Sequence, residues 1–114
     1  MSAPTDNETW VVETGDAIIR KKTRGGIESL TPSETLVYCL WVANYGMRNA
    51  GDLDTAADFY AEFHSSARRI AERLSFRFTH EAFSLPQSDL EREYFDRFES
   101  ICDEIRDAER RAIA

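Results

Sequence analysis

The feature that most constrains the fold is an apolar run placed directly after a helix-start signal. Thr31, Pro32 and Glu34 supply a capping hydroxyl, a proline at the first helical position and the glutamate of a capping box. Eight apolar residues follow, from Leu36 to Ala43. A buried strand can have the same run, but the capping box favours a helix. Because it is apolar on nearly all sides, we expect this helix, at about residues 32–46, to lie at the centre of the fold.

The segments before and after this helix predict further helices. We expect Asp16 to cap a helix that ends in cations before Gly25, and residues 1–15 to form a flexible or loosely packed arm. Gly46 and Gly51 tolerate positive backbone φ, so they are expected to end the central helix and turn the chain. Asp52 or Asp54 then caps the next helix.

The second half of the sequence continues the helical pattern. Residues 54–78 predict either one helix or two, and Ser65-Ser66 marks the expected break. A second capping box, Ser88 to Glu91, is expected to begin the last helix. Its apolar stripe has helical spacing and consists of Leu90, Tyr94, Phe98, Ile101, Cys102 and Ile105. The sequence thus predicts an all-α fold: residues 1–114 form a single domain, a compact bundle of about four to five helices.

Charge varies along the chain. The net charge is −7, with a neutral segment at 1–27, −5 over 28–64, +3 over 65–80 and −5 over 81–114. Two acidic segments around a short basic one disfavour direct nucleic-acid binding and favour cationic partners. The longest apolar run is far shorter than the roughly 20 residues of a membrane span, and the N-terminus lacks the pattern of a signal peptide. We therefore expect a cytoplasmic protein.

Residue types with catalytic or metal-binding chemistry are few. Cys39 and Cys102 lie on apolar faces, where cysteines are usually small buried hydrophobic residues. His64 and His80 do not stand at ligand spacing to either cysteine, so no metal site is expected. A phosphate-binding glycine loop is missing, and no cofactor is expected. The sequence predicts a non-enzymatic protein, although a small enzyme with a spatially assembled site remains an alternative.

Two further patterns concern surfaces. Arginines 69, 73 and 77 stand four residues apart, and we expect this row to pair with the acidic last helix; a nucleic-acid patch is the alternative. Phe76, Phe83 and Phe95 fall off the main apolar stripes or at their edges. They are either ordinary exposed or loop-packed aromatic residues or a self-association patch, and on the second interpretation we predict a homodimer.

The arrangement resembles a family of small acidic helical bacterial proteins known chiefly through a DNA-mimic member. The resemblance covers about residues 26–107. It is carried by the Leu-Thr-Pro-Ser-Glu start at 30–34, the central apolar helix, the Asn-Tyr-Gly-Met-Arg-Asn stretch at 44–49 with Gly51-Asp52 after it, and the helix from Ser88 to Ile105. The resemblance implies an all-α fold without known enzymatic activity, and carboxylates that a DNA-binding protein accepts in place of DNA.

The expected function is binding of a protein partner with a basic surface, such as a transcription factor or a phage-defence effector. An immunity or antitoxin-like protein that neutralises a cationic toxin is the alternative. Rigidly held carboxylates would favour such partners electrostatically. The predicted acidic face combines residues of two helices: Asp52, Asp54, Asp58 and Glu62 of one, and Glu91, Glu93, Asp96, Glu99 and Asp103 of the last.

Overall fold

The described part of the chain, residues 5–113 of a computed structural model, is all-helical. Its elements are α1 (Asn7–Gly25), the 3-10 turn η1 (Ile27–Ser29), α2 (Pro32–Asn49), α3 (Asp54–Phe59), α4 (Phe63–Arg73), α5 (Arg77–Phe83) and α6 (Gln87–Ile113). The predicted all-α bundle is confirmed, with six α-helices in these residues rather than four to five. None of the helices in residues 5–113 combines the length and the apolar character that crossing a membrane requires.

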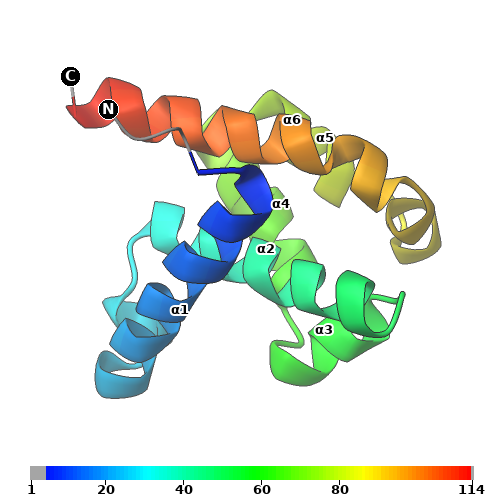
Figure 1. Cartoon of the computed structure of the whole chain (residues 1–114), viewed down its shortest axis with the longest axis horizontal. Coiled ribbons are helices and arrows are strands. Elements are labelled where there is room, and N and C mark those ends of the chain that lie inside the picture. Colours follow the sequence, from blue (N-terminus) through cyan, green and yellow to red (C-terminus); the bar gives the residue numbers. More distant parts are fainter. Residues whose placement is uncertain (1–4, 114) are drawn as a thin grey trace.

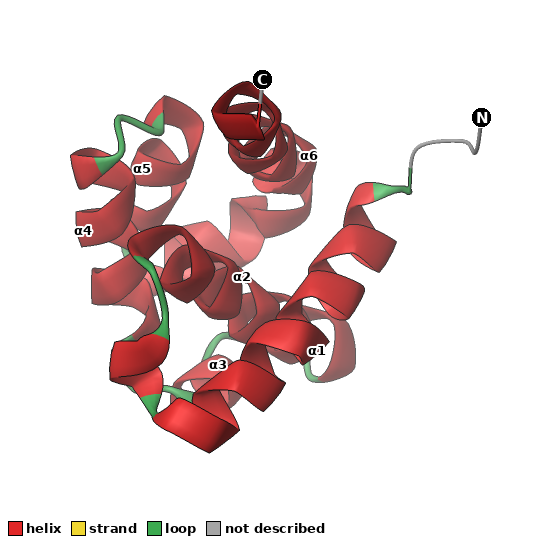
Figure 2. Ribbon diagram, turned by 90° about the vertical axis from the view of Figure 1, so that its left-hand side faces the viewer, coloured by secondary structure: helices red, strands yellow, loops and turns green. Residues whose placement is uncertain are grey.

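The α2 helix lies at the centre, as expected. Thr31 Oγ1 accepts a hydrogen bond from the backbone N–H of Glu34, and Glu34 Oε1 accepts one from the N–H of Thr31, so the predicted capping box is present. Apart from the half-buried Trp41, all of residues 36–43 are buried. Figure 2 shows α2 between α1 on one side and α4 and α5 on the other, and in Figure 1 α6 runs along one side of the bundle.

The first helix begins earlier than predicted. Asp6, not Asp16, is its N-cap, because Asp6 Oδ1 accepts a hydrogen bond of 2.7 Å from the N–H of Thr9. Val11 is fully buried, and Gly15 lies so close to Trp41 that a Cβ atom there would overlap the indole ring. The expected arm is therefore wrong for residues 7–15, which form the first half of α1; residues 1–4 lie outside the described part.

The glycine at position 46 does not end α2. The helix continues to Asn49, and Gly51, with φ of +74°, makes the turn that follows. A Cβ atom on Gly46 would stand 2.6 Å from the carbonyl oxygen of Asp52 and 3.1 Å from the backbone nitrogen of Ala56. Gly46 therefore lets the start of α3 approach the backbone of α2, which is a packing role rather than a turn.

Residues 54–83 form three short helices. The first break falls at residues 60–62 and not at Ser65-Ser66: Ser66 is buried inside α4, and its hydroxyl lies 3.2 Å from the Tyr60 hydroxyl. Ser75, with φ of 61°, separates α4 from α5. The arginine row at 69, 73 and 77 is consequently divided between two helices.

The α6 helix carries the predicted apolar stripe but not the predicted capping box. It begins at Gln87, and the N–H of Leu90 donates to the carbonyl of Pro86, so Ser88 already lies inside the first turn. The stripe is confirmed, since its six residues are each at most 2% exposed. Burying this stripe attaches α6 to the rest of the bundle.

Candidate functional site

The nine acidic residues of the predicted face do not lie on one continuous surface. Asp52 precedes α3, Asp54 and Asp58 lie in it, and Glu62 follows it, so these four do not share a helical face. Asp58 and Glu62 are exposed, and neither makes a side-chain hydrogen bond or ion pair with a described residue. Glu93 pairs with Arg97 one turn further along α6.

Two of the predicted acids, Asp54 and Glu91, hold α3 against the start of α6, and Asp52 caps α3 locally, as predicted. Asp52 Oδ1 accepts hydrogen bonds from the N–H and the hydroxyl of Thr55, which lower the pKa of Asp52. Asp54 Oδ1 accepts from Gln87 Nε2 at 2.7 Å. Glu91 Oε2 accepts from the N–H of Leu53 at 2.7 Å. These carboxylates therefore stabilise the start of α3 and its contact with α6.

Another carboxylate of α6, which the sequence analysis did not single out, holds α5. Glu104 accepts hydrogen bonds of 2.9 Å from the backbone N–H groups of Phe78 and Thr79 and from the Thr79 hydroxyl. The first N–H groups of a helix lack intrahelical partners and attract negative charge. Glu104 thus caps α5 from a distant part of the chain, a role that no local sequence pattern signals.

The remaining predicted acids of α6 form an exposed group, which we call the α6 acidic ridge: Asp96, Glu99 and Asp103. Asn7 Nδ2 donates to Glu99 Oε1 at 2.7 Å and to Asp103 Oδ1 at 3.1 Å. No lysine or arginine of the described chain forms an ion pair with any of the three. The ridge is therefore an exposed part of α6 without ion-pair neutralisation.

A polar junction beside the ridge joins α2 to α6. The buried Tyr94 hydroxyl donates to Asn44 Oδ1 at 2.9 Å, and Arg48 Nε donates to the same oxygen at 3.0 Å. The Arg48 guanidinium lies over the rings of Phe95 and Phe98, at 5.1 and 5.2 Å from their centroids. Polar residues four positions apart at the end of an apolar helix are the sequence signal for this junction.

The same arginine extends the junction to α1. Arg48 Nε lies 3.4 Å from Glu8 Oε1, and Arg106 Nη1 donates at 2.8 Å to the Asn7 side chain and to the Thr5 carbonyl. The first turn of α1 is thereby held to α2 and α6 at the position of the ridge. The part of α6 that carries the ridge is thus held by contacts from two other helices, α1 and α2.

The arginine row does not pair with the last helix, contrary to expectation. Arg77 pairs with Glu81 within α5, and Arg69 Nη2 lies 3.5 Å from Ser66 Oγ. In residues 5–111, whose side chains are described, none of the row's arginines forms an ion pair with α6. The pairing fails because α5, held by Glu104, packs directly against α6 and carries only Arg77 of the row.

The predicted self-association patch is also not assembled. Phe76 and Phe83 belong to the core, at 9% and 1% exposure, and only Phe95 is open to solvent, at 48%. A different aromatic group lies on the surface: Tyr45 and Phe59 are exposed, and their rings contact each other and the ring of Trp41. Self-association itself stays a prediction.

Both cysteines are buried, and His64 is packed against aromatic rings. Burial raises the pKa of Cys39 to about 12 and that of Cys102 even higher, which keeps both thiols protonated at neutral pH. The His64 ring packs against Phe63 and Phe83. Within residues 5–111, no three histidine, cysteine, aspartate or glutamate side chains are grouped as metal ligands.

The chain was compared with protein-family models, curated proteins and solved structures, and no match was found. The resemblance to the acidic helical family therefore stays a prediction.

Proposed function

We propose that this protein is a cytoplasmic, non-enzymatic regulator or inhibitor that binds a protein partner with a basic surface through the α6 acidic ridge. The observation that carries the proposal is that Asp96, Glu99 and Asp103 are exposed and lack ion-pair partners in the described chain. On the rest of α6, Asp89, Glu93 and Asp107 are paired with arginines. Cations of a partner thus find uncompensated charge at the ridge.

The surroundings of the ridge support protein binding. Phe95 is exposed one helical turn before Glu99, so an apolar ring stands beside the carboxylates. Aromatic residues surrounded by polar groups often contribute most of the binding free energy of a protein interface. The hydrogen bonds from Asn7 fix two of the three carboxylates, which lowers the entropy cost of binding.

The charge density of α6 distinguishes general acidic recognition from close DNA mimicry. Between Asp89 and Asp107, eight acidic and three basic residues give a net charge of −5 over about 27 Å of helix. This is about one charge per 5 Å, whereas duplex DNA carries one per roughly 1.7 Å. We therefore place mimicry of DNA second, and propose as the principal mode that the ridge neutralises a limited basic patch, as in an inhibitor or immunity protein.

The test compares two triple variants with the same change in charge. Asp96→Asn, Glu99→Gln and Asp103→Asn remove the ridge charges while keeping oxygen atoms that can accept from Asn7. The matched control is Asp58→Asn, Glu62→Gln and Glu72→Gln, three exposed acids outside α6. Each protein is immobilised, incubated with native lysate at low salt and eluted with a salt gradient, and the eluted proteins are identified by mass spectrometry.

The expected result is a basic protein that wild type and control retain and that the ridge variant releases at lower salt. Equal loss in both variants would assign the binding to net charge alone, and equal retention would refute the role of the ridge. If duplex DNA displaces the captured protein from the ridge, mimicry becomes the mode of binding. Displacement by salt but not by DNA supports neutralisation of a cationic protein.

A further inference from the structure

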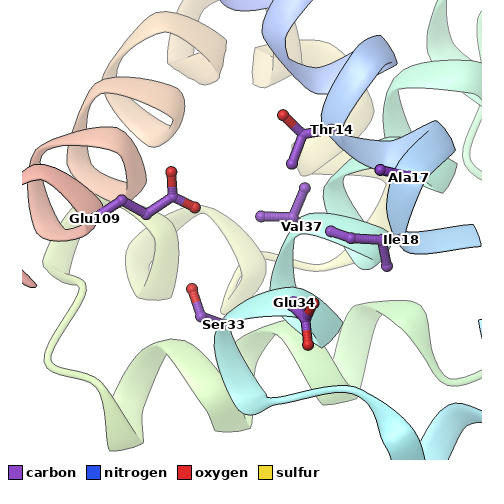
Figure 3. Close-up of a pocket in the computed structure, with 7 residues that line it drawn as sticks. All are labelled: Thr14, Ala17, Ile18, Ser33, Glu34, Val37 and Glu109. Carbon is purple, nitrogen blue, oxygen red and sulfur yellow. The ribbon is translucent and has the colours of Figure 1, made fainter. Parts of the chain in front are cut away.

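A cleft away from the α6 acidic ridge is lined by none of the ridge residues. It lies between α1, α2 and α6 and has a volume of about 290 Å³, close to the lower limit of small-molecule sites, roughly 300 Å³. Figure 3 shows the side chain of Glu109 extending from α6 toward Val37 of α2, with Thr14 of α1 on the opposite side. The apolar part of the lining comes from Ala17, Ile18 and Val37.

The carboxylate of Glu109 has no ion-pair partner in the described chain. Arg106, about one helical turn before Glu109, donates instead to the Thr5 carbonyl and the Asn7 side chain, and its guanidinium packs over the Trp10 ring. Arg110, next to Glu109 in the sequence, pairs with Asp107. Burial raises the pKa of Glu109, and Arg106 offsets this only in part. A partly desolvated carboxylate without a counter-charge gains free energy when a cation binds beside it.

The second carboxylate of the cleft is already occupied. Glu34 Oε1 accepts from Lys21 Nζ at 2.8 Å and from the N–H of Thr31 at 2.9 Å. The hydroxyls of Thr14 and Ser33 also line the cleft, and neither makes a hydrogen bond within the described residues. Glu109 therefore supplies the free charge, and two hydroxyls supply further acceptors.

This set of groups matches one class of ligand. A primary ammonium has three N–H donors and no acceptor, and the cleft offers one carboxylate and two hydroxyl acceptors above an apolar wall. One carboxylate with two hydroxyls is too few ligands for a divalent metal site. We infer that the cleft binds a small aliphatic primary ammonium, with the ammonium group on Glu109 and the alkyl chain on Ile18 and Val37.

The first test is an NMR titration of the ¹³C-labelled protein with n-hexylammonium chloride at about pH 8, where both charged groups are ionised. n-Hexanol, which has the same alkyl chain without the charge, is the matched ligand control. We expect saturable shifts of the Ile18 and Val37 methyl signals with a dissociation constant in the millimolar range, as for a ligand of about seven non-hydrogen atoms. Equal binding of hexanol, or no saturable shift with the amine, would overturn the inference.

Two variants locate the binding. Glu109→Gln is expected to weaken hexylammonium binding about tenfold, because one charge-assisted hydrogen bond is lost. Ala17→Leu, which fills an exposed position of the cleft, is expected to block binding while preserving helix propensity. Glu72→Gln has the same charge change on α4 and is expected to bind like wild type. If Glu109→Gln binds as tightly as wild type, Glu109 is not the ammonium site.

The pKa of Glu109 gives an independent readout. Because the ligand cation favours the ionised carboxylate, saturation with hexylammonium is expected to lower the pKa of Glu109 measured from its side-chain carboxyl ¹³C signal. An unchanged pKa at saturation would contradict contact between the two groups. The same titration with Nα-acetyl-lysine methylamide separates the sources of the ammonium: tighter binding of this compound than of hexylammonium indicates a lysine side chain of a protein, and weaker binding indicates a free amine.

Discussion

The hydrogen bond between Tyr94 and Asn44 leads to a prediction about how α2 and α6 are held together. The Tyr94 hydroxyl is buried and donates to Asn44 Oδ1, its only hydrogen-bond partner in residues 5–111. Asn44 Oδ1 accepts a second hydrogen bond, from Arg48. Loss of the tyrosine hydroxyl therefore leaves the asparagine satisfied, whereas loss of the asparagine leaves a buried hydroxyl without a partner.

This asymmetry determines the expected free energies of unfolding. Tyr94→Phe removes one neutral hydrogen bond and is expected to cost about 1 kcal/mol. Asn44→Ala leaves the buried hydroxyl unsatisfied, at about 1–3 kcal/mol, and creates a small cavity at about 1 kcal/mol. The total expected for Asn44→Ala is thus about 2–4 kcal/mol. In the double variant the unsatisfied hydroxyl is gone, so the cost of the double variant is expected to lie about 1–3 kcal/mol below the sum of the single costs.

Urea unfolding followed by far-UV circular dichroism measures the free energy of unfolding of wild type, the two single variants and the double variant. Tyr45→Phe is the matched control for Tyr94→Phe. Tyr45 is exposed on α2, next to Asn44, and its hydroxyl makes no hydrogen bond with a described residue. This control is expected to change the free energy of unfolding by less than about 0.5 kcal/mol. Equal costs for Tyr94→Phe and Asn44→Ala, or strict additivity in the double variant, would refute the asymmetric hydrogen bonding.

Three further predictions concern other parts of the fold. Gly46→Ala is expected to lower the free energy of unfolding by about 1–3 kcal/mol despite the higher helix propensity of alanine, because its Cβ would meet the Asp52 carbonyl; urea unfolding measures this. Hydrogen bonds from Lys21 and Thr31 lower the pKa of Glu34, so its stabilising effect is present above about pH 4.5 and is lost as the pH falls through the lowered pKa; a smaller acid-induced drop in Tm for Glu34→Ala than for wild type checks this. Cys39 and Cys102 are expected to resist iodoacetamide in the native protein at pH 7 and to react after unfolding, as mass spectrometry would show.

Local signals explain which parts of the fold were predictable from sequence. The capping box at Thr31 involves residues three positions apart, and the α6 stripe follows helical periodicity. Both features can therefore be recognised within a short segment of sequence. The start of α1 differs from the prediction because Asp16 has the residue type of an N-cap, whereas the structure places Gly15 and Asp16 inside the helix, with Gly15 against the Trp41 ring. Gly46 likewise makes room for a distant neighbour, the backbone at Asp52 and Ala56, which the local sequence does not reveal.

The bounds of the short helices could not be predicted, because several of their stabilising groups come from far along the chain. Helices of six and seven residues, such as α3 and α5, are unstable in isolation. The N–H of Leu53, directly before α3, donates to Glu91, and the first N–H groups of α5 donate to Glu104; these two acids stand 38 and 25 residues or more away. The N–H of Thr55 in α3 has a local side-chain acceptor, Asp52. A sequence window of some fifteen residues around α3 or α5 does not include Glu91 or Glu104, so a local pattern cannot reveal these contacts.

The same contacts explain why fewer carboxylates of α6 are available to a partner than its acidic composition suggests. Glu91 and Glu104 face the N-termini of α3 and α5, where the helix dipoles favour a negative charge. Asp89, Glu93 and Asp107 lie against arginines of the same helix, and such exposed pairs reduce the local field with little effect on stability. The acids between these positions, Asp96, Glu99 and Asp103, have no such neutralisation, and Asn7 of α1 orients two of them. A partner that recognises charge would therefore meet the middle of α6, next to Phe95, rather than the whole acidic helix.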